Sequence, residues 1–306
     1  MELYRKYRPT TFDDVVGQDI AIKTIKKELE NGTHVFLFTG NAGCGKTTLA
    51  RIVGREVDVG ELSLWEINSA DNRGIDTARE IQEKMKFNPA DGSAMMWILD
   101  EVHMMTSAAQ NALLKALEEV PESVYFCLCT TDPQKLIEPL KSRCSIINVK
   151  PLNHDDMLFL LKRTSRSEGI KVGNDVFDKI ISLANGGSRK ALKLLAKVLY
   201  LENDDERLDA LEIGDYEGNA ETIELCRVLA NPKNNRASAF QMLAKVDMSD
   251  CEKVRQAIMG YMNVIILKGN ASPRVIACMQ AFGEADTYRN GKNALTIAIL
   301  DMFDMC

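Results

Sequence analysis

Residues 40–48 read GNAGCGKTT and satisfy the pattern G-x-x-x-x-G-K-[ST]. They directly follow VFLFT, an apolar run typical of a buried strand, and they precede LARIVGREV, which is typical of a helix. Gly40, Gly43 and Gly45 allow the backbone to wrap so closely that its N–H groups converge on phosphate oxygens at the positive end of the helix. The stretch therefore predicts a triphosphate site between a strand and a helix.

Two polar side chains of this loop have specific expected roles. Lys46 would contact the β- and γ-phosphates, and the Thr47 hydroxyl would ligate Mg²⁺. The alternative is a glycine-rich turn without a ligand, but the flanking strand and helix favour the phosphate loop. The other loop residues expected around the nucleotide are Asn41, Ala42, Gly43, Cys44, Gly45 and Thr48.

A pair of acids ends another buried segment, MMWILDE, about fifty residues further along the chain. Asp100 would hold Mg²⁺ through water, and Glu101 would orient and polarise an attacking water molecule. Thr131, at the end of the next apolar segment, could hydrogen-bond the γ-phosphate or that water. Adjacent acids can also merely cap a helix, but in the same sheet as a phosphate loop they favour catalysis.

The chain changes its pattern after Pro151. Before it, five β segments alternate with helices, which predicts an α/β fold with a doubly wound, five-stranded parallel sheet and ligands at the carboxyl ends of its strands. Beyond it, only helical patterns occur, broken by NGGS, ENDD, ANPKNN and KGNASP. We expect an α/β domain over 1–152, a helical lid over 153–205 and an all-α domain over 206–306. The basic and aromatic start of the chain is expected to be an extended docked arm, since Pro9 prevents a continuous helix.

Composition narrows the function classes. The net charge of −6 argues against indiscriminate nucleic-acid binding, although a local basic surface can still act at short range. The eight cysteines lack metal-type spacing, which favours reduced thiols and no zinc. No apolar run approaches a bilayer span and the start has no signal region, so we expect a cytoplasmic protein without a membrane partner. His34, His103 and His154 show no ligand spacing, and a surface or supporting role near the site is expected for His103.

The motifs together resemble a known family. KYRPTTFDDVVGQ, GNAGCGKTT, INSADNRGID, ILDEVHMM, AAQNALLKALEE, TTDPQKLIEPLKSRC and GGSRKAL occur in the order and spacing of the AAA+ clamp-loader ATPases, across roughly residues 4–195. The chain is similar to the small subunits of replication factor C and to the bacterial tau/gamma subunits. The resemblance implies an ATPase motor with ATP and Mg²⁺, working with other subunits in a ring of five. Such a ring opens a sliding clamp and loads it on primer-template DNA.

The same resemblance implies roles for individual residues. Thr131 takes the first sensor position, and Arg189 in GGSRKAL contacts the γ-phosphate from the lid. Arg143 in the SRC motif becomes a finger that reaches the neighbouring subunit's ATP, and Asn68 restrains Glu101 until DNA binds. The segment expected to line the adenine pocket comprises Tyr7, Arg8, Pro9, Val15 and Val16.

The sequence departs from the family at a few points. Asn41 and Ala42 stand where prolines are common, and Cys44 stands where threonine is common, but no phosphate-facing group is lost. The four-cysteine zinc module of the tau/gamma subunits has no counterpart between Cys44 and Asn68. This difference again implies no zinc.

The segment DNRGIDTAREIQEKMKF matches the family helix that faces DNA. Arg73 and Arg79, with the backbone N–H groups of Gly74 and Ile75, are expected to contact phosphates without reading bases. The alternative for Arg79 is an ordinary solvated helix with pairs such as Arg79 with Glu83. Phe87 lies off the apolar stripe and is expected either to insert into the clamp or to pack under the following loop.

Two other functions remain open from the sequence. The chain could be another AAA+ machine acting on DNA, such as a helicase loader or a branch-migration motor, although TTDPQKLIEPLKSRC favours a clamp loader. It could also be a non-catalytic scaffold subunit of the same ring. The residues expected to carry out catalysis are all present, which argues against a scaffold: Lys46, Thr47, Asp100, Glu101 and Arg143.

Overall fold

The computed structural model describes residues 2–212, 220–248, 250–267 and 269–305 of the 306-residue chain. The chain forms two compact units, Met1–Tyr200 and Leu201–Cys306. The sheet and the helices that directly follow it lie in the first unit. The three-domain division at residues 152 and 205 stays a prediction.

The first unit is built on a five-stranded sheet in which every paired strand is parallel. The strand order is β2-β3-β4-β1-β5, which matches the predicted doubly wound sheet. Thr39 pairs with Thr130, and Asn68 pairs with Asp100, so the carboxyl ends of neighbouring strands are level. The strands are β1 (Val35–Thr39), β2 (Val59–Asn68), β3 (Ala94–Asp100), β4 (Val124–Thr130) and β5 (Ser145–Asn148).

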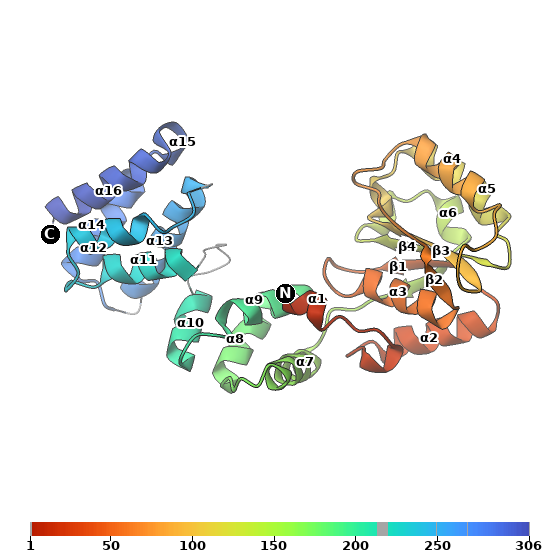
Figure 1. The fold of residues 1–306 in the computed structure, drawn as a ribbon, viewed down its shortest axis with the longest axis horizontal. Helices are drawn as coiled ribbons and strands as arrows, with labels where there is room; N and C mark the ends of the chain where they lie inside the picture. Colours follow the sequence, from red (N-terminus) through yellow and green to blue (C-terminus); the bar gives the residue numbers. More distant parts are fainter. Residues whose placement is uncertain (1, 213–219, 249, 268, 306) are drawn as a thin grey trace. The chain divides into compact units, whose positions relative to one another are not determined.

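Helices cover both faces of the sheet (Figure 1). Alternate residues of β1 point to opposite faces: Phe36 joins the core with Ile25 and Leu49 of one helix layer, and Leu37 joins Ile81 and Leu113 of the other. One layer contains α2 (Asp19–Glu30) and α3 (Lys46–Glu56); the other contains α4 (Ile75–Lys84), α5 (Ser107–Glu118) and α6 (Glu138–Ser142).

The start of the chain differs from the extended arm expected from the sequence. It forms a short helix, α1 (Leu3–Lys6), and a 3₁₀ turn, η1 (Phe12–Asp14), on either side of Pro9. Leu3 and Phe12 are buried, and the Thr11 and Asp14 side chains cap η1 reciprocally. Local capping and burial of these two apolar side chains therefore fold the segment, while Pro9 keeps its two turns separate.

Three helices complete the first unit, and α1 packs against the third of them. The Asn153 side chain caps the first by accepting the Asp156 N–H at 2.8 Å. The predicted break at NGGS is present, with Asn185 in the left-handed conformation that ends the second helix. The helices are α7 (His154–Ser167), α8 (Asn174–Ala184) and α9 (Ser188–Val198).

The second unit, as far as its residues are described, contains helices and no strand. Its core joins Leu225, Ile258, Phe282 and Ile299 from four helices. This confirms the helical pattern predicted beyond Pro151. The helices are α10 (Asp204–Glu212), α11 (Ala220–Ala230), α12 (Arg236–Leu243), α13 (Cys251–Leu267), α14 (Pro273–Glu284), α15 (Thr287–Asn290) and α16 (Lys292–Asp304).

Two further features of the described residues concern membrane-spanning helices and the cysteines. Among the helices that the structure describes, none is both long and apolar enough to cross a membrane. The described cysteines are free thiols, at positions 44, 127, 129, 144, 226, 251 and 278.

Candidate functional site

The phosphate loop follows β1 and turns through three glycines with positive φ: Gly40 at 145°, Gly43 at 75° and Gly45 at 108°. A side chain at Gly40 would place its Cβ only 2.2 Å from the Val149 carbonyl oxygen, so this turn also depends on close backbone approach. Helix α3 begins directly after Gly45, at Lys46. The backbone thus forms the strand–loop–helix unit predicted from the sequence.

Lys46 is held inside the loop. Only 5% of the residue is exposed, and its ammonium donates to the carbonyl oxygens of Gly40 at 2.9 Å and Asn41 at 3.0 Å. A phosphate group could replace these neutral acceptors with charged ones, which form stronger hydrogen bonds to an ammonium. The lysine is therefore already confined to the space where a phosphate would lie.

Thr47 and Asp100 come together from different elements. The Thr47 hydroxyl, in the first turn of α3, donates to Asp100 Oδ2 at 3.0 Å at the end of β3. A hydroxyl and a carboxylate oxygen at this distance suit a hard, oxygen-preferring cation such as Mg²⁺. The two residues predicted to hold the metal therefore fit it by donor type and by proximity.

Glu101 follows β3 in a left-handed conformation, with φ of 50°. Its Oε2 accepts the Thr131 hydroxyl at 3.1 Å, and the His103 Nδ1 lies 3.3 Å from the same oxygen. Thr131 thus meets the carboxylate from the position just after β4, and His103 meets it from the short 3₁₀ helix η2 (Val102–Met104).

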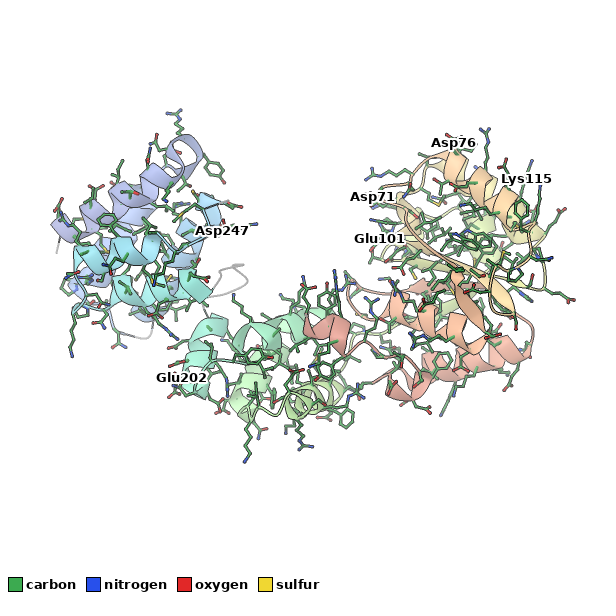
Figure 2. All side chains as sticks on the ribbon, viewed as in Figure 1. Asp71, Asp76, Glu101, Lys115, Glu202 and Asp247 are labelled. Atoms are coloured by element: carbon green, nitrogen blue, oxygen red, sulfur yellow. The ribbon has the colours of Figure 1, made fainter. Side chains whose placement is uncertain are left out.

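Asn68, the expected restraint on Glu101, makes other contacts. Its amide donates to Asp71 Oδ2 at 2.7 Å, and its Oδ1 accepts the Ala70 N–H at 3.0 Å. Figure 2 labels Asp71 and Glu101, which lie beyond the ends of the neighbouring strands β2 and β3. Asn68 is close to Glu101 along the sheet, but its role as a switch stays a prediction.

These groups surround one cavity. All five residues expected around the adenine line it, together with Lys46, Thr47, Asp100, Glu101 and Arg189. The loop residues from Ala42 to Thr48 also line it, whereas the contribution of Asn41 is its carbonyl bond to Lys46. Lining residues that sequence reasoning did not identify are Tyr4, Asp14, Gln18, Leu49, Leu152, Leu160, Arg163, Ser188 and Leu192.

The start of α9 closes over the phosphate loop. The Arg189 N–H donates to the Gly43 carbonyl oxygen at 3.3 Å, and the Ser188 hydroxyl donates to the same oxygen at 3.0 Å. The Arg189 guanidinium lies 5.4 Å from the centre of the Tyr4 ring, a cation–π distance. Arg189 is thus beside the cavity, as predicted, and Tyr4 is the aromatic residue that it contacts.

Glu168 ties the start of the chain to the end of α7. It accepts hydrogen bonds from Lys6 Nζ at 2.7 Å and from the Tyr7 hydroxyl. These bonds, the one from Lys6 first, hold the pKa of the Glu168 carboxyl below its ordinary value, and the bond to Glu168 raises the pKa of Tyr7. The cavity wall that contains Tyr7 is therefore anchored to the end of α7.

Arg143 lies away from this cavity. It follows α6 on the surface, ion-paired with Glu118 and donating to the Pro139 carbonyl oxygen at 3.1 Å. It does not appear among the described residues that line the cavity. Its side chain is thus partly exposed and lies outside the cavity of its own chain, and its role as a finger stays a prediction.

Comparisons with known proteins point to the same family as the motifs. Residues 58–153 match the family model described as DNA polymerase III, delta subunit. The chain is 35% identical over 225 residues to the tau subunit of DNA polymerase III from Bacillus subtilis, covering 66% of this chain and 40% of that protein. It is 34% identical over 215 residues to the Escherichia coli tau subunit, covering 63% of this chain and 33% of that protein. These matches support the resemblance to bacterial AAA+ clamp-loader subunits that the motifs predicted.

Solved structures agree with this assignment at the level of the fold. A RuvB Holliday junction branch migration motor from Thermotoga maritima has a TM-score of 0.58 at 19% identity, covering 88% of this chain and 94% of that one. At such low identity the likeness shows the fold alone. The chain spans about two fifths of the length of the Bacillus subtilis tau subunit.

The helix that matches the DNA-facing helix of clamp loaders is α4. Gly74 precedes it, and Ile75 opens it. The Arg73 side chain donates to the Ala70 carbonyl oxygen at 2.7 Å, and Arg79 pairs with Asp76 at 3.3 Å rather than with Glu83. Both arginines are exposed, so they could reach a phosphate, but contact with DNA stays a prediction.

Phe87 and Met85 separate as predicted at the end of α4. Met85 is buried in the core, whereas 70% of Phe87 is exposed. Phe87 therefore does not pack under the following loop, and its contact with the clamp stays a prediction.

Some site residues gave little signal in the sequence. Tyr4 contacts both Arg189 and Lys193, at 5.4 and 5.7 Å from its ring centre, because α1 packs on α9. Its place three residues before Tyr7, on a short helix instead of an extended arm, is the pattern that could have indicated it. Glu168 gave no such signal because Lys6 and Tyr7, the partners that connect it to the start of the chain, are more than 160 residues away.

Proposed function

We propose that this chain binds and hydrolyses ATP with Mg²⁺. The observation that supports the proposal is that Lys46, the pair of Thr47 and Asp100, Glu101 and Arg189 converge on one cavity from separate elements. Phosphoryl transfer needs positioning and charge stabilisation more than covalent chemistry, and these residue types supply both.

Each side chain has one task in this proposal. Lys46 exchanges its two loop carbonyls for β- and γ-phosphate oxygens. Thr47 and Asp100 hold the metal, Asp100 through water, and bound Mg²⁺ would neutralise phosphate charge. Glu101 orients the attacking water, while Thr131 and Arg189 contact the γ-phosphate. Tyr7, Arg8, Pro9, Val15 and Val16 hold the adenine.

Arg143 acts in trans in this proposal. Because it lies outside its own cavity and on the surface, a neighbouring subunit's nucleotide is the partner that its position allows. An arginine finger supplied in this way raises the rate by roughly 10³ to 10⁵ in comparable systems. Hydrolysis should therefore require assembly.

The proposed biological role is that of the motor subunit of a sliding-clamp loader. The similarity to tau subunits supports membership of a clamp-loader complex. In our proposal this complex is a ring of five subunits that opens a clamp and loads it on primer-template DNA at a replication fork. The chain would hold no zinc, because it has no cysteine between Cys44 and Asn68. Arg73, Arg79 and the N–H groups of Gly74 and Ile75 would track DNA phosphates, Asn68 would act as the DNA-responsive switch, and Phe87 would contact the clamp. The proposed parts are an ATPase domain over 1–152, a lid over 153–205 and a collar over 206–306.

The experiment uses the chain in the complex that it forms with its co-expressed neighbours. We expect ATP-dependent binding to the sliding clamp of the same source, and ATP hydrolysis that falls at least about 10²-fold in Glu101→Gln. The matched control is Glu119→Gln, an exposed carboxylate at the end of α5.

The outcomes separate the alternatives. Hydrolysis without clamp binding would favour another AAA+ machine acting on DNA, and clamp binding with equal, negligible hydrolysis by both forms would favour a scaffold. DNA stimulation and its salt dependence should weaken in Arg73→Ala, because phosphate contacts release counterions. If they are unchanged, the assignment of α4 to the DNA path is wrong.

A further inference from the structure

We propose that His103 is a positioning residue for Glu101: its imidazole holds one carboxylate oxygen and leaves the other to the attacking water. The inference rests on the proposed ATPase function and assigns a role to a residue for which the sequence predicted only a supporting place near the site.

The His103 imidazole lies between Glu101 and the end of β4. His103 Nδ1 lies 3.3 Å from Glu101 Oε2 and 3.0 Å from Thr130 Oγ1, at the end of β4. Only 9% of the His103 side chain is exposed, against 34% for Glu101. The imidazole is therefore a confined group beside a more exposed carboxylate, which is the arrangement expected of a support.

The surrounding hydrogen bonds define the tautomer. Thr130 Oγ1 already accepts the Asp132 N–H at 3.0 Å. A lone pair on His103 Nδ1 would face the negative oxygen of Glu101 and be repelled by it. Nδ1 therefore carries the hydrogen and donates toward Glu101 Oε2 and Thr130 Oγ1.

The Glu101 carboxylate is held by side chains, since no backbone N–H of the described residues donates a hydrogen bond to it. The Glu101 backbone lies in the left-handed region, with φ of 50°, and this conformation costs a non-glycine residue a free energy of about 1–2 kcal/mol. Asn68, the other candidate restraint, gives its amide to Asp71. Thr131 and His103 are then the two side chains that the described structure brings to the carboxylate.

The two supports differ in what they can do once a γ-phosphate is present. Thr131 has a single hydroxyl hydrogen, and it donates that hydrogen to Glu101 Oε2 at 3.1 Å. Donating to the phosphate instead would release the carboxylate from Thr131. His103 would then keep Oε2 in place, while Oε1, which takes part in no hydrogen bond described in this structure, remains for the water.

The test compares His103→Leu with His103→Asn in the assembled complex, measuring ATP affinity and the single-turnover rate separately. The Asn amide nitrogen can occupy the position of Nδ1 and donate as the ring does. We expect Leu to lower the rate by about 10²-fold, the effect of a small misplacement of a reacting group, with ATP affinity unchanged. Asn should restore most of that loss. His154→Leu, an exposed histidine on α7, is the matched control and should leave the rate unchanged.

A double-mutant cycle separates positioning from general destabilisation. If His103 acts through Glu101, His103→Leu adds little further loss in a Glu101→Gln background. Three results would each overturn the role of His103 while Glu101→Gln remains impaired. They are equal losses of rate in His103→Leu and His103→Asn, additive losses in the double-mutant cycle, and a full rate in His103→Leu. A Glu101→Gln complex with the full rate would instead overturn the proposed function, and the positioning role with it.

Discussion

The guanidinium of Arg143, just beyond α6, forms an ion pair with the carboxylate of Glu118, the last residue of α5. Both side chains are partly exposed, at 36% and 46%, so the pair contributes little to stability. It does, however, compete with any phosphate of a neighbouring subunit for the same guanidinium.

Releasing this pair should therefore favour the trans contact slightly. We expect Glu118→Gln to raise ATP hydrolysis by the assembled complex by at most about fivefold, because an exposed ion pair is worth about 0–1 kcal/mol. Steady-state hydrolysis measures the effect, with Glu119→Gln as the control. A fall of more than tenfold would mean that Glu118 supports the finger instead of retaining it.

Gly40 is predicted to be intolerant of a side chain. Gly40→Ala should destabilise the chain by about 1–3 kcal/mol, because φ is +145° and the new Cβ would meet the Val149 carbonyl oxygen at 2.2 Å. Thermal unfolding should show a lower Tm. Gly283→Ala in α14 has its nearest neighbour at 3.7 Å and should leave Tm equal or higher. Equal Tm values for wild type and Gly40→Ala would show that β5 moves away freely.

Glu168 should give the first unit a pH-dependent component of stability. Because its folded pKa lies below the ordinary 4.5, its contribution is present above about pH 4.5 and is lost as the pH falls through the folded value. Glu168→Gln should therefore lower Tm at pH 7, and the difference from wild type should narrow below pH 4.5. Glu30→Gln, an exposed carboxylate on α2, is the control. A difference that persists unchanged at low pH would contradict the role of these hydrogen bonds.

Phe87 tests the clamp contact. Phe87→Ala should weaken clamp binding by roughly five- to thirtyfold, because truncating an interface aromatic costs about 1–2 kcal/mol, and basal hydrolysis should be spared. Ile20→Ala, with 73% of Ile20 exposed on α2, is a control of similar exposure. Unchanged clamp affinity in Phe87→Ala would remove Phe87 from the interface.

The sequence allowed prediction of what depends on short stretches of chain. The phosphate loop, the acids that end β3 and the parallel sheet follow from contiguous motifs and apolar periodicity, and the structure has them. Contacts between distant segments were not predictable. Tyr7 meets Glu168 across 161 positions, and Tyr4 meets Arg189 only because α1 folds as a helix against α9.

The orientation of Asn68 shows a second limit. Its position at the end of β2, level with Asp100, follows from the strand pattern. Its side chain nevertheless joins a local turn with Ala70 and Asp71, because those partners are two and three residues away. A motif defines the residue type at a position, whereas the competing local hydrogen bonds decide where its side chain points.

The central claim is that Arg143 completes the ATP site of a neighbouring subunit. The most direct measurement is ATP hydrolysis by the assembled complex and by the isolated chain, each with Arg143 and with Arg143→Ala, alongside ATP affinity. Lys141→Ala, which removes a nearby cation paired with Glu138, is the control. We predict that Arg143→Ala lowers hydrolysis by the complex about 10³-fold or more while ATP still binds, and that the isolated chain is nearly inactive in both forms. An isolated chain that hydrolyses ATP as fast as the complex, with or without Arg143, would contradict the claim.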